Sequence, residues 1–187
     1  MLWLNSKAPL AEALAANFGK KKKIERLGIQ GEKIVAQYLR ESGETVIEPL
    51  DLFDSRKDMT TNGKTVEVKT KQLFYSKDST SIKENQERKC RGVDRLFLVV
   101  LPSKAYMDRY PNQVHKLSGE YGKIYEITDP KNLVVKKDVH KHSNNVSRRD
   151  VMLIIPLSKI EQPSIVLARD LTQEEYFECQ KNTDTFY

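Results

Sequence analysis

Cysteine is scarce in this chain, and the two cysteines that it has are isolated. Cys90 and Cys179 are far apart among the 187 residues. Two distant thiols support neither a disulfide framework nor a cysteine-based zinc site. A reducing cytoplasm is therefore the expected setting.

Long apolar runs are also missing. The longest cover residues 96–101 and 151–155, and the mean hydropathy is −0.60. Because a membrane-spanning helix needs about 20 consecutive apolar residues, the sequence excludes such a span. The first residues lack a basic region followed by a long apolar stretch, so no secretory signal is expected. Glycine-rich phosphate loops, serine nucleophile elbows and dinucleotide fingerprints are absent as well.

What the sequence does contain is a basic globular composition. Hydrophobic residues make up 39% and charged residues 31%, which suits a single domain over residues 1–187. The net charge is +6, but residues 170–187 hold five acidic residues and one basic residue, so the first 169 residues carry +10. A body this basic is what binding to a phosphate backbone requires.

Hydrophobic spacing predicts the order of helices and strands. The predicted helices cover residues 6–18, 24–42, 81–91 and a last segment from Thr172, where Thr172 and Glu175 have capping-box spacing. The predicted strands cover residues 45–48, 57–61, 64–71, 95–101, 123–127, 133–136 and 151–157. Residues 106–118 are expected to form a loop or irregular helix. This order predicts an α/β fold with a central mixed β-sheet flanked by helices.

Within that single domain, three regions are expected. Residues 1–23 form a helical, basic extension, residues 24–101 hold the core motif, and residues 102–187 add strands and an acidic helix.

An Asn62-Gly63 pair between two extended segments predicts a two-residue hairpin turn, since both residue types accept positive φ. The register that follows places Asp58 opposite Glu67. Cross-strand partners share a face of the sheet and lie about 5 Å apart. The turn is therefore predicted to bring two carboxylates side by side.

Opposed like charges destabilise a sheet unless they are well solvated, share a proton or hold a cation. Strand alternation places Lys69 on the same face as Glu67, and Val66 and Val68 on the other. Two carboxylates with open positions suit Mg²⁺, and an adjacent ammonium can orient a water or stabilise charge on phosphorus. Glu32 borders the inward face of the preceding predicted helix, from where it could reach this sheet.

The order Gly31-Glu32 on a helix, then Asp58, then Glu67-Val-Lys69 on a strand resembles the PD-(D/E)XK nuclease superfamily. The likeness is to its restriction-endonuclease-like and Holliday-junction-resolvase-like members, and it covers about residues 28–101. It implies a restriction-endonuclease-like core and a metal-dependent nuclease that hydrolyses DNA, most simply an endonuclease, in a prokaryotic or phage-infected cell.

The same resemblance assigns roles to individual residues. It implies that Asp58 and Glu67 bind Mg²⁺ or Mn²⁺, that Lys69 assists the attacking water, and that Glu32 supports the metal and the catalysis. Lys57 stands where the motif usually has proline, and Asp51 and Asp54 are weaker substitutes for Asp58.

DNA is the expected partner, and a homodimer is an open possibility because the acidic C-terminal segment could contact another subunit. The residues expected to contact the nucleic acid are Lys71, Gln86, Arg88, Lys89 and Arg91. Two alternatives remain: an RNA nuclease, and a catalytically inactive module of the same fold that binds nucleic acid or a protein.

Two other groups of residues have simpler explanations. His140 and His142 would face the same side of a strand, but an exposed basic turn is favoured because no further ligand residue lies at metal-binding spacing. Tyr106, Arg109 and Tyr110 could stack on bases, although packing against the sheet is favoured for at least one of them.

Overall fold

The computed structural model describes residues 26–49, 58–73, 79–141 and 149–181. The helix predicted over residues 6–18, most of the basic extension, and Asp51, Asp54, Lys57 and His142 lie outside these ranges. None of the helices in the described ranges is long and apolar enough to cross a membrane.

A six-stranded sheet forms the centre of the molecule, in the order β1-β2-β3-β5-β6-β9. Strands β3 and β5 pair in parallel, and the other neighbours pair antiparallel. The predicted α/β fold with a mixed sheet is therefore confirmed. The strands are β1 (Val46–Ile47), β2 (Met59–Thr61), β3 (Lys64–Leu73), β5 (Arg95–Pro102), β6 (Lys123–Ile127) and β9 (Ile165–Asp170).

A second, three-stranded sheet has the order β4-β8-β7. Its strands are β4 (Ser79–Lys83), β7 (Lys136–Lys141) and β8 (Arg149–Pro156). Short 3₁₀ turns cover Glu84–Gln86 and Pro130–Asn132. Residues 26–41 are helical, and the other helices are α2 (Glu87–Arg91), α3 (Lys104–Arg109) and α4 (Gln173–Lys181).

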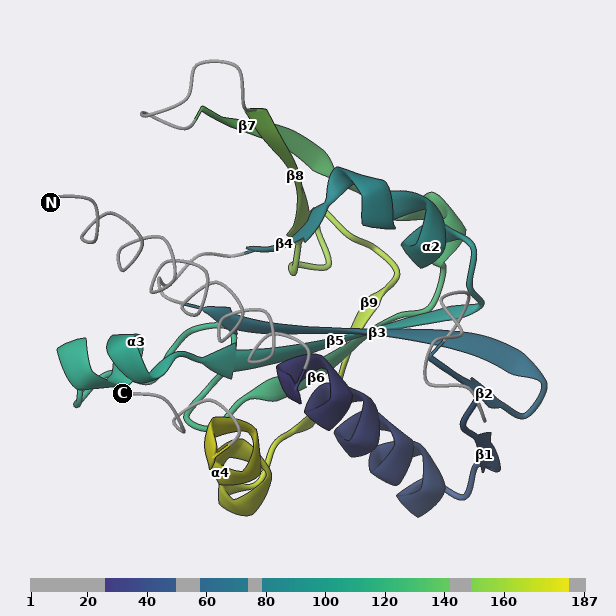
Figure 1. The fold of residues 1–187 in the computed structure, drawn as a ribbon, viewed down its shortest axis with the longest axis horizontal. Helices are drawn as coiled ribbons and strands as arrows, with labels where there is room; N and C mark the ends of the chain where they lie inside the picture. Colours follow the sequence, from purple (N-terminus) through teal and green to yellow (C-terminus); the bar gives the residue numbers. More distant parts are fainter. Residues whose placement is uncertain (1–25, 50–57, 74–78, 142–148, 182–187) are drawn as a thin grey trace, which may run out of the picture.

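Each face of the central sheet is covered by its own layer (Figure 1). On one face the 26–41 helix and α4 bury an apolar cluster that includes Leu39, Val66 and Phe97. On the other face the second sheet and α2 bury a cluster that includes Ile82 and Leu96. Because side chains alternate along β3 and β5, neighbouring residues of one strand contribute to different layers.

The hairpin predicted between β2 and β3 is confirmed. Asn62 and Gly63 have φ values of 47° and 77°, the left-handed conformation that a two-residue turn of this kind requires. The strands pair with Met59 opposite Val66, as the predicted register requires.

The capping box at the start of α4 is also confirmed. The Glu175 amide donates to Thr172 Oγ1 at 3.2 Å, and the Thr172 amide donates to Glu175 Oε2 at 2.8 Å. These two bonds satisfy backbone donors that the first turn of a helix leaves free.

Two predictions from hydrophobic spacing were wrong in part, and one strand was missed. The first three residues of the helix predicted over residues 81–91 belong to strand β4, because Ile82 is fully buried and the segment pairs along β8. Only Glu87–Arg91 is α-helical in the predicted helix over residues 81–91. The strand predicted over residues 133–136 begins at Lys136, after a 3₁₀ turn. Strand β9 was missed because it is an edge strand with an irregular exposure pattern and faces a register shift in β6.

Two glycines of the 26–41 helix differ in what surrounds them. A Cβ at Gly31 would lie 1.8 Å from Thr70 Oγ1 on β3, whereas no described atom lies within 4 Å of a Cβ at Gly28. Gly31 therefore allows the helix to approach the strand that carries the carboxylate of Glu67.

We expect Gly31→Ala to lower the free energy of unfolding by about 1–3 kcal/mol, because it overpacks this contact. Gly28→Ala is the matched control and is expected to raise it by up to about 1 kcal/mol through helix propensity. Urea denaturation of both variants checks the prediction. Equal effects of the two substitutions would contradict the close packing of helix and strand.

Candidate functional site

The start of the β2–β3 hairpin fixes the side chain of Asp58. Its amide donates to the Val66 carbonyl at 3.0 Å, and its Oδ2 accepts a hydrogen bond from the Val68 amide at 2.7 Å. Strand pairing stops at Met59. The prediction that Asp58 pairs with Glu67 across the two strands was therefore wrong. The carboxylate of Asp58 instead takes the place of a backbone acceptor and lies beside the middle of β3.

Glu67 is the most deeply buried charged residue of the site, with a side-chain exposure of 0%. Its Oε1 accepts from the ammonium of Lys69, two residues along the strand, which confirms that both side chains project from the same face. Its Oε2 makes no hydrogen bond with any residue that the structure describes.

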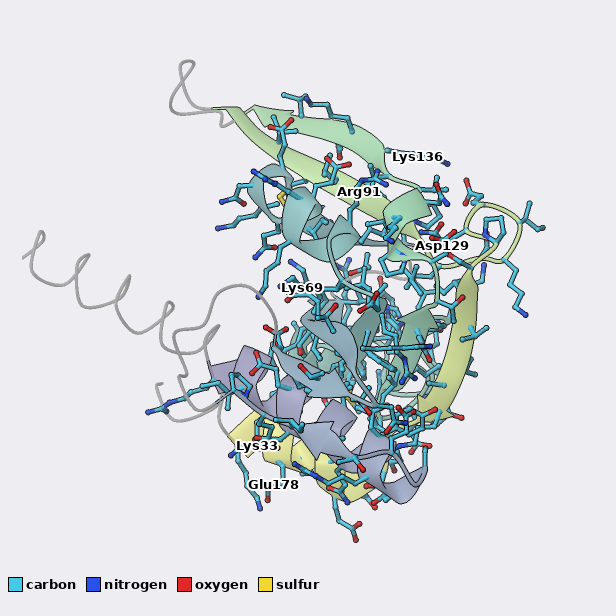
Figure 2. All side chains as sticks on the ribbon, turned by 90° about the vertical axis from the view of Figure 1, so that its right-hand side faces the viewer. Lys33, Lys69, Arg91, Asp129, Lys136 and Glu178 are labelled. Carbon is cyan, nitrogen blue, oxygen red and sulfur yellow. The ribbon has the colours of Figure 1, made fainter. Side chains whose placement is uncertain are left out.

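The ammonium of Lys89, on α2, contacts both carboxylates. Its Nζ lies 3.0 Å from Asp58 Oδ1 and 2.8 Å from Glu67 Oε2, the latter an ion-pair contact with poor hydrogen-bond geometry. Figure 2 shows the neighbouring Lys69 between the layer that carries Arg91 and the layer that carries Lys33. The site is therefore built from the hairpin, the middle of β3 and α2.

The electrostatics of the cluster follow from its burial. Burial raises the pKa of Glu67, the negative charge of Asp58 raises it further, and Lys69 and Lys89 oppose this shift. For Lys89, burial lowers the pKa, but its contacts with Glu67 and then Asp58 outweigh burial and leave the pKa raised. The ammonium of Lys89 is thus held in its charged form by the carboxylates.

Glu32 lies close enough to this cluster to interact with its charges. Burial, followed by the charges of Asp58 and Glu67, raises the pKa of Glu32 to about 7. Within the described residues, however, no three His, Cys, Asp or Glu side chains are grouped as a set that could hold a metal ion. Glu32 is therefore a neighbour of the carboxylate pair and does not close a three-ligand set with it.

The residues expected to contact nucleic acid fall into different environments. Lys71 is half-buried, and burial, followed by the charges of Lys83 and Lys69, lowers its pKa. Arg88 is exposed and Gln86 is half-buried. Arg91 donates to Glu87 at 2.8 Å and to the Lys131 carbonyl at 3.1 Å.

Lys89 is the residue of the candidate site whose position the sequence did not predict. Lys89 was expected to face nucleic acid, but it contacts the carboxylates of Asp58 and Glu67. No spacing rule relates a residue of α2 to the β2–β3 hairpin. The only signal was the position of a lysine in a polar segment between two buried strands.

Two other groups have structural explanations. Tyr106 is buried, and its ring centroid lies 5.0 Å from that of Tyr110 and 4.6 Å from that of His115, so it packs against these two rings. Arg109 is exposed, with its guanidinium 5.5 Å from the ring of Tyr110. His140 lies in strand β7 opposite Asp150 of β8, so the turn expected at this residue was wrong.

A polar hollow near the hairpin turn is lined in part by Arg95. Its guanidinium donates to Glu126 at 2.6 and 3.1 Å and to Glu44 at 2.7 Å, and it lies 5.0 Å from the ring of Phe97. These contacts satisfy the charge of Arg95, so the hollow is best explained as a structural ion-pair network.

No family model matches the chain, and no curated protein or solved structure is significantly similar to it. Two carboxylates converge on one position between Asp58 Oδ1 and Glu67 Oε2, and a second ammonium, from Lys69, lies beside them.

The raised pKa of Glu32 predicts a pH-dependent stability. Between pH 4.5 and about 7 the folded chain holds a proton on Glu32 that the unfolded chain has lost, so this contribution to stability falls as pH rises through that window. We expect the stability of Glu32→Gln relative to the wild type to increase across the window and to level off above it. Urea denaturation at several pH values measures the difference.

An Asp58→Asn background serves as the control. It removes a charge that raises the pKa of Glu32, so the window is expected to move to lower pH. A difference between Glu32→Gln and the wild type that is constant from pH 4 to 8 would place Glu32 away from the cluster.

Proposed function

We propose that this chain is a metal-dependent nuclease that hydrolyses phosphodiester bonds of DNA as an endonuclease, with a restriction-endonuclease-like core of the PD-(D/E)XK type. One observation carries the proposal. The carboxylates of Asp58 and Glu67 come from different parts of the hairpin, and both contact one cation, the ammonium of Lys89. The ammonium of Lys69 forms an ion pair with Glu67 beside them.

The donors of the site suit a hard divalent cation. Mg²⁺ and Mn²⁺ prefer carboxylate oxygens and keep open positions for water and phosphate oxygens. Glu67 Oε2 is buried and has no hydrogen bond within the described residues, and Asp58 Oδ1 faces the same cation. Asp58 and Glu67 would hold the metal, and Glu32 would act near it as an outer carboxylate.

When bound, such an ion supplies a Lewis acid for a phosphate oxygen and lowers the pKa of a coordinated water. The chain contributes the remaining parts. The ammonium of Lys69 is fixed by Glu67, from where it can hold a water for attack on phosphorus or stabilise the negative charge that develops there. The hydrogen bond from the Val68 amide keeps the carboxylate of Asp58 in position.

Positive charge near the site supports an anionic polymer as substrate. Lys71 follows Lys69 on the same face of β3, and Lys83 on β4 lies close enough to lower the pKa of Lys71. The exposed Arg88 adds a further cation on α2. A phosphate backbone is the class of ligand that would neutralise such a group.

One observation favours a second candidate, a non-catalytic module that binds nucleic acid. The two carboxylates and the ammoniums of Lys69 and Lys89 are formally neutral together, so the cluster is already balanced without a metal. A module of this kind would retain the basic surface and would bind DNA without cutting it.

Plasmid nicking in Mg²⁺, Mn²⁺ and EDTA separates the two candidates. We expect nicking with either metal and none with EDTA. Asp58→Asn and Lys69→Met are each expected to lower the rate by about 100-fold or more, because the first removes a metal ligand and the second removes the ammonium that stabilises the transition state. Lys136→Met, which changes an exposed lysine paired with Glu161, is the control and is expected to retain wild-type activity.

Gel shifts of the same proteins complete the test. DNA binding by the wild type without metal-dependent nicking would contradict the proposal and support the non-catalytic module. Cleavage of RNA and not of DNA in a substrate panel would assign the site to RNA instead.

A further inference from the structure

The position of Lys89 has a consequence for metal binding. We propose that the ammonium of Lys89 occupies the cation position between Asp58 and Glu67, and that it must leave this position before a divalent metal can bind. This inference rests on the proposed function, because it concerns the metal that the nuclease would use.

Within the described residues, one oxygen of each carboxylate already accepts a hydrogen bond, and the other oxygen faces a cation. Asp58 Oδ2 accepts the hydrogen bond of the Val68 amide, and Glu67 Oε1 accepts that of Lys69. The remaining oxygens, Asp58 Oδ1 and Glu67 Oε2, both contact Nζ of Lys89, at 3.0 and 2.8 Å. Lys89 and a metal would therefore compete for the same two oxygens.

The two cations also exclude each other physically. Mg²⁺ binds carboxylate oxygens at about 2.0–2.1 Å, so an ion shared by these oxygens would be in contact with Nζ of Lys89. With Lys89 in place, a dication would add its whole charge to a cluster that is already neutral and in which Glu67 is fully buried. Departure of Lys89 removes both the contact and one positive charge.

Lys89 is better placed to leave than Lys69. Its side chain is 26% exposed and extends from the short helix α2, so rotation about its own bonds can bring the ammonium to solvent. Lys69 lies on β3 beneath the second layer, with 16% exposure, and occupies a different oxygen of Glu67. Lys89 is thus the exchangeable counter-ion, and Lys69 is the resident ammonium of the site.

Mn²⁺ titration calorimetry on the folded full-length chain, without DNA, tests this exchange. We expect Lys89→Met to bind Mn²⁺ about tenfold more tightly than the wild type, because no ammonium has to be displaced. Lys69→Met removes an equal charge from the same cluster but leaves Lys89 between the carboxylates, so its affinity is expected to stay within about threefold of the wild type.

Several outcomes would overturn the inference. Equal affinity of Lys89→Met and the wild type, or an equal gain in Lys69→Met, would show that Lys89 does not occupy the metal position. No Mn²⁺ binding by any variant would overturn both this inference and the proposed function. Should Lys89→Met fail to fold, Lys89→Gln, which keeps a polar donor but not the charge, is expected to show the same gain.

The inference and the proposed function can fail separately. Tighter binding by Lys89→Met, together with a wild type that nicks no plasmid in Mn²⁺, would support the exchange and contradict the nuclease. Nicking by the wild type, together with unchanged Mn²⁺ affinity in Lys89→Met, would support the nuclease and contradict the exchange.

Discussion

Two carboxylates held side by side beneath a protein layer need a cation, and the site depends on this requirement. Glu67 is fully buried and Asp58 is nearly so, with 11% of its side chain exposed. Burial and then the negative charge of Asp58 raise the pKa of Glu67, and nearby positive charge opposes that shift. Lys69 and Lys89 supply that positive charge, and burial, followed by the charges of Asp58 and Glu67, raises the pKa of the neighbouring Glu32 to about 7.

The fold meets this requirement with parts that are separate in the sequence. The Asn62-Gly63 turn sets the hairpin, alternation along β3 directs Glu67 and Lys69 to one face, and α2 brings Lys89 above them. The layer formed by the 26–41 helix covers the opposite face, where Val66 and Val68 pack. The polar cluster and the apolar core therefore share β3. A substitution in one of them that shifts β3 is expected to displace side chains of the other.

The site could be predicted from sequence as far as local rules extend. Turn chemistry and strand alternation predicted that Asp58, Glu67 and Lys69 lie close together. These two rules could do so because each relates residues only a few positions apart. The contact of Lys89 depends on how α2 docks above β3, which no local pattern records. The same limit explains β4, whose pairing with β8 and buried Ile82 overrode the predicted helix. It also explains why β9 was missed. This strand lies at the edge of the sheet and pairs with β6 across a register shift, so its buried and exposed residues do not alternate regularly.

A crystal soaked in Mn²⁺, measured at the manganese absorption edge, tests the central claim most directly. The account predicts an anomalous peak between Asp58 Oδ1 and Glu67 Oε2, with the Lys89 side chain turned away and Lys69 still bonded to Glu67. It would be contradicted by a fully occupied Mn²⁺ elsewhere on the chain, while Lys89 still bridges the two carboxylates.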